Sequence, residues 1–362
     1  MRKIQELMRS PSLQNRDGST VYHGGDLAAA RRLFPDAPEP WIDLSTGINP
    51  EPYPIPTLPA EVFTRLPDGE RLKELEASAA HRYRAPPGAE IVAAPGTQAL
   101  IQLLPQLHKA KNVGILGFTY GEYEQVWRAA GLAPRVVEDL DGLSACDLAI
   151  IVNPNNPDGR LVPAEDLAVL AHHLACRGGL LVVDEAFIDL LPRGRSLVPI
   201  LPEEGAMVLR SFGKTYGLPG VRLGFAVTGA ALAERLRKLL GPWAVSGPAI
   251  EIGRTALADD AWLNSTAERL PRRGAMVEEA MRLCGAEVVG GTPLFRLFAH
   301  REAEKLFALF GREGVLLRHF PERPNWLRAG LVADAYEERF KATAAMLAAP
   351  LPASKAMRGE VR

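Results

Sequence analysis

The chain has 362 residues, of which 47% are hydrophobic and 23% are charged, and its formal net charge is -1 at pH 7. This length suffices for one large domain and a smaller one, and the balanced charge argues against nucleic acid or a membrane surface as partner. The sequence predicts a cytoplasmic globular protein, on three observations. Its cysteines are scattered, its charged N-terminus has no signal-peptide core, and no apolar run is long enough to cross a bilayer.

The N-terminal part of the chain is expected to lie over a surface. We expect residues 1–20 to form a polar arm and a short helix to follow over residues 27–34. Prolines then recur at short intervals at Pro50, Pro52, Pro54, Pro56 and Pro59. Because proline fits neither a central strand nor a helix interior, this run is either a plain linker or a crossing between domains or subunits.

From about residue 90, apolar strands alternate with helical stretches. The candidate strands cover residues 91–94, 113–116, 135–138, 148–152, 180–184, 207–209 and 223–227. The candidate helices between and after them cover residues 98–108, 122–130, 164–176 and 230–240. Strands that are apolar on both faces are typical of a mostly parallel sheet covered by helices. The sequence therefore predicts an α/β fold with a seven-stranded sheet.

Beyond residue 242 the pattern predicts a smaller α+β domain. Helical stretches at 248–257 and 262–283 precede strands at 287–289 and 294–298, a helix at 302–310, a strand at 315–318, the segment 325–331 and a last helix from 335. We expect residues 1–50 to form an arm and a small-domain segment, 51–241 the large domain, and 242–362 the C-terminal small domain.

A glycine-rich loop between two apolar strands holds Lys214, with Ser211 before it and Arg222 after it. A lysine between buried strands loses hydration, which lowers its pKa and frees its amine to form a Schiff base. Serine and arginine are residue types that hold a phosphate. The motif predicts the lysine loop of a pyridoxal-phosphate enzyme, and a solvated lysine in a turn is the alternative for the motif taken alone.

Two further motifs follow strands of the expected sheet. The turn Gly96-Thr97-Gln98 enters a helix, where backbone N–H groups cradle a phosphate or simply begin the helix. Tyr120 follows the next strand, at the sheet edge where α/β folds bind ligands. Its ring can stack on a planar ligand or pack at the sheet edge.

Three polar residues have both a functional and a structural interpretation. Asn156, in a dense Asn/Pro turn, can direct its amide toward a phenolic oxygen or only shape the turn. Asp184 ends a buried strand and needs a cationic partner, either a protonated pyridine nitrogen or a protein side chain. Arg328, inside an apolar run, suits a substrate carboxylate or a buried ion pair.

In this order and spacing, the motifs resemble fold type I pyridoxal-phosphate enzymes of the aminotransferase superfamily, in the histidinol-phosphate aminotransferase-like branch. The resemblance implies that Lys214 carries the cofactor, Asp184 pairs with its pyridine nitrogen, Tyr120 stacks on its ring and Asn156 bonds its phenolic oxygen. Arg328 would grip the substrate carboxylate, and relatives are homodimers. The residues implied to hold the cofactor phosphate are Gly96, Thr97, Gln98, Ser211 and Arg222.

Within this branch, three stretches resemble the threonine-phosphate decarboxylases of cobalamin biosynthesis, namely residues 23–26, 43–50 and 184–189. These enzymes convert O-phospho-L-threonine to (R)-1-amino-2-propanol phosphate. The resemblance places the substrate phosphate near His23, Asn49 and Arg318, together with the backbone of residues 45–46. A class I/II aminotransferase uses the same residues and remains the alternative, and a cofactor-binding protein without enzymatic activity is the third possibility.

The sequence departs from the aminotransferase pattern at three positions. Phe187 replaces a tyrosine that bonds the phenolic oxygen, a change shared with the decarboxylases. Leu66 replaces a tyrosine that reaches the neighbouring subunit's cofactor phosphate, and Gly213 replaces a serine or threonine. Both of these affect the expected phosphate site.

Overall fold

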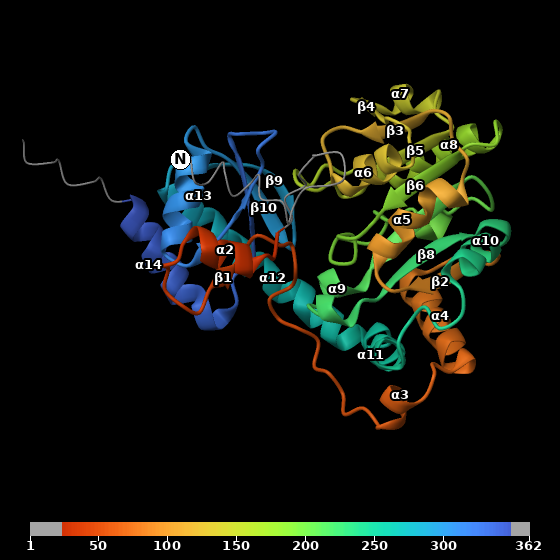
Figure 1. Cartoon of the computed structure of the whole chain (residues 1–362), viewed down its shortest axis with the longest axis horizontal. Helices are drawn as coiled ribbons and strands as arrows, with labels where there is room; N and C mark the ends of the chain where they lie inside the picture. The colour runs from red at the N-terminus through yellow and green to blue at the C-terminus, as the bar shows by residue number, and fades with distance from the viewer. Residues whose placement is uncertain (1–23, 349–362) are drawn as a thin grey trace, which may run out of the picture.

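The computed structural model describes residues 24–348 and centres on a seven-stranded sheet (Figure 1). The strands are β2 (Ala89–Ala94), β3 (Val113–Leu116), β4 (Arg135–Val137), β5 (Leu148–Val152), β6 (Leu180–Asp184), β7 (Ala206–Ser211) and β8 (Gly224–Gly229). Their order is β2-β8-β7-β6-β5-β3-β4, and only β8 runs antiparallel to its neighbours. The predicted mostly parallel seven-stranded sheet is confirmed.

Helices cover both faces of this sheet. One core contains side chains of α4 (Gly69–Tyr83), α8 (Ala164–Ala175) and α11 (Gly247–Leu257). The other core contains those of α5 (Thr97–Leu107), α6 (Glu122–Ala129) and α10 (Ala230–Leu240). Along β6, Leu181 and Val183 enter the first core and Leu180 and Val182 the second. This alternation explains why the central strands are continuously apolar.

Four α-helices lie outside those predicted from the sequence, namely α3 (Glu61–Thr64), α4, α7 (Leu140–Ser144) and α9 (Phe212–Thr215). The start of α4 carries a recognisable signal, because the Asp68 carboxylate accepts the backbone N–H of Glu70 at 2.7 Å. Its buried face, which includes Leu75 and Ala79, packs against α11 and β2 in the large-domain core.

The smaller domain combines both ends of the described chain. It has a four-stranded antiparallel sheet of order β12-β13-β10-β9. Its elements are β9 (Glu287–Thr292), β10 (Phe295–Ala299), β12 (Arg318–His319), β13 (Trp326–Gly330), α12 (Asp260–Leu283), α13 (Ala303–Arg312) and α14 (Glu337–Ala348). The N-terminal α2 (Leu27–Leu33) joins them, and β1 (Ile42–Asp43) pairs in parallel with β11 (Val315–Leu316). The strand expected over 315–318 is therefore split between two sheets.

The apolar cores locate the domain boundary. Phe34 and Trp41 share one core with side chains of α12, α13 and α14. In contrast, Ile250 and Leu257 of α11 lie in the large-domain core with Leu75. We therefore propose to move the boundary expected at residue 242 into α12.

The proline-rich residues 51–60 run from the small domain to α3 (Figure 1). Within residues 24–348, no helix combines the length and apolar character needed to cross a membrane.

Candidate active site

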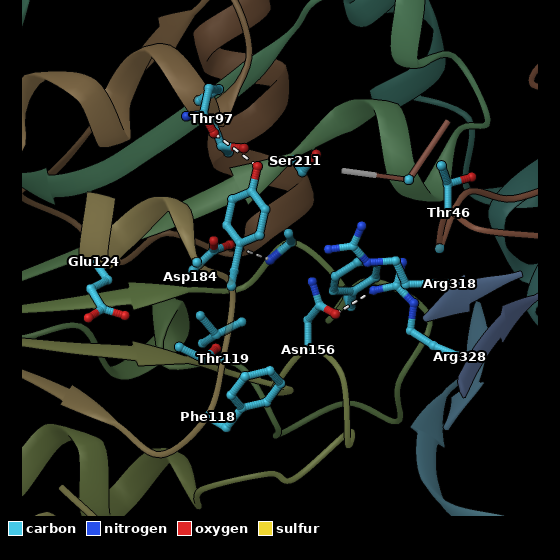
Figure 2. Close-up of a pocket in the computed structure, with 18 of the residues that line it drawn as sticks. Thr46, Thr97, Phe118, Thr119, Glu124, Asn156, Asp184, Ser211, Arg318 and Arg328 are labelled. Carbon is cyan, nitrogen blue, oxygen red and sulfur yellow. Dashed lines mark hydrogen bonds between the residues drawn. The ribbon is translucent and has the colours of Figure 1, made fainter. Parts of the chain in front are cut away.

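A cavity of about 930 Å³ lies between the two domains, at the carboxyl ends of the parallel strands (Figure 2). Ligands of open α/β sheets bind at this edge. The structure brings together on its wall most of the expected site residues, namely Gly96, Thr97, Gln98, Tyr120, Asn156, Asp184, Ser211, Lys214, Arg222, Arg318 and Arg328. Two are not among them: Asn49 lies elsewhere, and His23 falls outside the described residues.

Lys214 belongs to the short helix α9 (Phe212–Thr215), which directly follows β7. Burial, and then the positive charge of Arg328, lower the pKa of its amine to about 8. Asp184 partly opposes this effect. A lysine with so low a pKa has an appreciable neutral fraction near neutral pH, as a nucleophilic amine requires.

Asp184 ends β6 with a buried carboxylate that two donors hold in place. The Tyr123 hydroxyl donates to Oδ2 at 2.9 Å, and the Ala186 N–H donates to Oδ1 at 3.0 Å. Burial raises the pKa of Asp184, so the charged form is costly until a cation faces it. Tyr123 was not among the residues predicted for the site, although it falls on the buried face of α6.

Two glycines shape the place where the cofactor phosphate is expected. Gly96 precedes α5 with φ +85°, and a Cβ there would lie 2.6 Å from the guanidinium of Arg222. A Cβ on Gly224 would lie 2.7 Å from the backbone N of Thr97. The first turn of α5 and the Arg222 side chain therefore face one space, which combines a helix N-terminus with a fixed cation. This donor set fits a phosphate group.

We predict that Gly96→Ala weakens pyridoxal-phosphate binding by about tenfold or more, because the new methyl displaces Arg222 and the backbone is strained. Equilibrium titration of the apoprotein with the cofactor measures the effect. Gly88→Ala is the matched control, since Gly88 has φ +89° but a Cβ there meets nothing within 4 Å. Equal dissociation constants for the two variants would contradict the proposed role of the close approach between Gly96 and Arg222.

Tyr120 and Gln98 form a hydrogen-bonded unit beside the expected phosphate site. The Tyr120 hydroxyl donates to Gln98 Oε1 at 3.1 Å, and Gln98 Nε2 donates to the buried Glu122 carboxylate. The ring of Tyr120 also packs edge-to-face on Tyr123, with centroids 6.3 Å apart. Because these contacts restrain the phenol, its ring forms a fixed side of the cavity near Asp184.

Arg328 enters the cavity from β13 and lies beside Arg318 of β12 (Figure 2). Its guanidinium donates to Asn156 Oδ1 and, at 2.7 Å, to the carbonyl of Ser45. Its buried Nε has no hydrogen-bond partner among the described residues. Burial, and then Arg318, lower the pKa of Arg328 to about 9. An anionic ligand would relieve both the unsatisfied donor and the repulsion between the two cations.

Asn49, expected near the substrate phosphate, is not among the residues that line the cavity. Its side chain is 2% exposed, and Nδ2 donates to the carbonyl of Thr215 at 2.9 Å. Its backbone N–H donates to the carbonyl of Lys214 at 3.0 Å. Asn49 is thus directed at the lysine loop, because residues 49–53 run alongside residues 214–216. Ser45 and Thr46, in contrast, do line the cavity.

The three departures from the aminotransferase pattern have different structural settings. A Cβ on Gly213 would lie 2.8 Å from Cα of Pro219, so this loop leaves no room for serine or threonine. Phe187 packs edge-to-face on Phe295 at 5.0 Å, and the Lys214 amine lies 5.9 Å from its ring centre. Leu66 is 67% exposed on the loop after α3.

The fold and the site together define a class of enzyme. The carboxyl edge of a mostly parallel sheet presents three groups to the cavity. They are a buried lysine of lowered pKa, the Asp184 carboxylate, and a helix N-terminus with an arginine beside it. This is the arrangement of fold type I pyridoxal-phosphate enzymes, and the residues present fit that cofactor. Within residues 24–348 no group of three or more His, Cys, Asp or Glu side chains is arranged to hold a metal ion.

Sequence comparison agrees with this class. The family Aminotransferase class I and II matches residues 40–345, and the chain belongs to it. A threonine-phosphate decarboxylase of a Sinorhizobium species is 43% identical over 88% of this chain and 96% of its own. That of Pseudomonas aeruginosa is 39% identical, over 86% and 93%.

Comparison of structures confirms the fold. The histidinol-phosphate aminotransferase of Sinorhizobium meliloti, solved in complex with pyridoxal-5'-phosphate, superposes with a TM-score of 0.75. The match covers 91% of this chain and 95% of that one at 21% identity. The predicted resemblance to the histidinol-phosphate aminotransferase-like branch is thereby confirmed at the level of the fold.

Proposed function

We propose that this chain decarboxylates O-phospho-L-threonine to (R)-1-amino-2-propanol phosphate, in cobalamin biosynthesis, with pyridoxal phosphate as cofactor. The observation that carries the proposal is the pair of guanidiniums of Arg318 and Arg328 in one cavity with Lys214. A phosphorylated amino acid offers two anionic groups, a carboxylate and a phosphate, for these two cations. Histidinol phosphate has a phosphate but no carboxylate. The two similar decarboxylases support the same assignment.

The residues of the chain divide the work of this reaction. The bound cofactor supplies an electron sink for the bond that breaks at the substrate Cα. Asp184, held by Tyr123, would pair with the cofactor's ring nitrogen and keep it protonated. Arg328 holds the carboxylate and Arg318 the phosphate, which fixes the orientation of the substrate. After carbon dioxide has left, the Lys214 amine is placed to return a proton to Cα.

The decisive experiment incubates the holoprotein with O-phospho-L-threonine and measures carbon dioxide and aminopropanol phosphate. We expect stoichiometric release of both, and much slower release from unphosphorylated L-threonine. Turnover that requires 2-oxoglutarate, with accumulation of the amine form of the cofactor, would instead establish an aminotransferase. A cofactor-loaded protein without turnover on either route would establish a binding protein.

We predict that Arg318→Gln raises the KM for O-phospho-L-threonine by about tenfold or more, because a charge-assisted contact to the phosphate is lost. The kcat should change less, since the phosphate does not react. Steady-state kinetics and inhibition by inorganic phosphate measure both effects. Arg312→Gln, at an exposed position of α13, is the control. An unchanged KM in Arg318→Gln would place the phosphate elsewhere.

We also propose a cytoplasmic homodimer. Large apolar side chains are exposed on and near α3, where Ile55, Phe63 and Leu66 are 58%, 66% and 67% exposed. Trp243, 58% exposed, lies on the loop that leads to α11. Apolar groups gathered on one part of a surface are typical of an interface between subunits. The described cysteines are free, which supports a reducing compartment. Sedimentation velocity tests the dimer, and a monomer at micromolar concentration would contradict it.

A further inference from the structure

The backbone that follows Lys214 is held through a buried residue, Thr215, which is 0% exposed. The Thr215 hydroxyl donates to Asp189 Oδ2 at 3.1 Å. Its carbonyl accepts from Asn49 Nδ2 at 2.9 Å. None of these three residues is among those that line the cavity. They therefore act on the site through Lys214 and not by touching a ligand.

The Asp189 side of this contact is rigid. The carboxylate also accepts from Arg210, whose guanidinium donates to Glu185 at 3.1 Å and lies 4.1 Å from the ring centre of Tyr83. Glu185 in turn accepts from the Ser196 hydroxyl and the Leu197 N–H. A buried network with this many bonds has few alternative arrangements, because every displaced group would lose its partner away from water.

The Asn49 side is held by backbone hydrogen bonds. The N–H of Asn49 donates to the carbonyl of Lys214 at 3.0 Å, and that of Tyr53 to the carbonyl of Tyr216 at 2.8 Å. Three consecutive carbonyls at the end of α9 thus accept from residues 49–53, where so short a helix cannot satisfy them itself. Gly217 permits the approach, with φ +64° and a hypothetical Cβ 2.7 Å from the Asn49 carbonyl oxygen.

We infer that Thr215 is a positioning residue, clamped between Asp189 and Asn49, which fixes where the Lys214 amine stands in the cavity that also holds Asp184 and Arg328. Asp184 ends β6 and Asp189 lies on the loop that directly follows it, so the clamp ties the lysine loop to the segment that carries Asp184. A misplacement of about 1 Å at a reacting group can cost about 100-fold in rate. The inference rests on the proposed cofactor site but not on the identity of the substrate.

The test uses the Thr215→Val holoenzyme, in which a methyl replaces the hydroxyl at nearly constant volume. We expect kcat to fall by about tenfold or more while KM changes by less than about twofold. Without any substrate, the pH midpoint of the visible absorbance of the lysine-bound cofactor should shift, because the distances from Lys214 to Asp184, Arg222 and Arg328 change. Thr215→Ser retains the hydroxyl and should restore both quantities.

The matched control is Thr228→Val. Thr228 on β8 is also buried, and its hydroxyl donates to the Ala206 carbonyl at 2.7 Å. Both variants remove the same atoms and one buried hydrogen bond, so they should lose similar thermal stability. Only Thr215→Val should shift the absorbance midpoint and kcat. Equal midpoints and kcat in the two variants would overturn the inference.

A second variant keeps the test decisive if Thr215→Val does not fold. Asn49→Ala removes the other half of the clamp, and we expect the same fall in kcat and a shifted midpoint with little change in KM. A selective rise in KM for O-phospho-L-threonine with an unshifted midpoint would return Asn49 to the substrate phosphate and overturn the inference. Because the absorbance titration needs no substrate, an error in the proposed reaction would not mimic either result.

Discussion

Lys214→Ala is expected to abolish turnover of O-phospho-L-threonine and to leave no cofactor that borohydride can fix covalently to the protein. The lysine is both the attachment point and the proposed proton donor, so no other described side chain replaces it. Mass spectrometry of peptides after borohydride treatment locates the attachment. Lys305→Ala, at an exposed lysine on α13 that forms an ion pair with Glu302, is the control. Covalent cofactor retained by Lys214→Ala would refute the assignment of the whole site.

The same variant should change the pH dependence of apoprotein stability. Burial lowers the pKa of Lys214 from 10.5 to about 8, so between these values the unfolded chain binds more protons than the folded one. The free energy of unfolding should therefore rise with pH over this interval, by up to about 3 kcal/mol. Lys214→Ala should lose the part of this rise that belongs to Lys214 and keep the smaller part due to Arg328, whose pKa is lowered to about 9. Urea denaturation of both apoproteins at pH 7.5 and pH 10 measures it.

Asp184→Asn is expected to lower kcat/KM by about 10³-fold, because a neutral amide cannot stabilise a protonated ring nitrogen. The apoprotein should nevertheless be no less stable than the unaltered apoprotein at pH 7. Burial raises the pKa of Asp184, so ionisation of this carboxyl costs more in the folded chain than in the unfolded one. The free energy of unfolding therefore falls as the pH rises above the pKa of Asp184 in the unfolded chain. Asparagine removes this cost and can still bond Tyr123.

The control for this prediction is Asp147→Asn, where the expected signs are opposite. Two backbone N–H groups, of Lys111 and Asn112, donate to the Asp147 carboxylate, and the first of these bonds is the main cause of its lowered pKa. That substitution should reduce stability at pH 7 and leave kcat/KM unchanged. Thermal unfolding of the apoproteins and steady-state kinetics of the holoproteins separate the two cases. A large loss of stability in Asp184→Asn would make its lost activity a folding effect.

The central elements and the reactive residues follow from local features of the sequence. Continuous apolar runs such as residues 148–152 and 180–184 predict buried parallel strands, and these strands are observed as β5 and β6. A polar residue directly after such a strand, as at Asp184, or in a glycine-rich loop, as at Lys214, must lie at the ligand-binding edge of the sheet. The cavity accordingly contains both residues.

Other features were decided only by the tertiary structure. The partner of Asn49 is Thr215, the donor to Asp184 is Tyr123, and residues 42–43 pair with 315–316 across almost the whole chain. Hydrophobic periodicity encodes which face of an element is buried, but not which distant segment approaches it. The approach of Asn49 to the lysine loop, for example, is one that Gly217 permits. The sequence by itself thus determined the reactive groups and the sheet that presents them, whereas packing between distant segments decided how those groups are held.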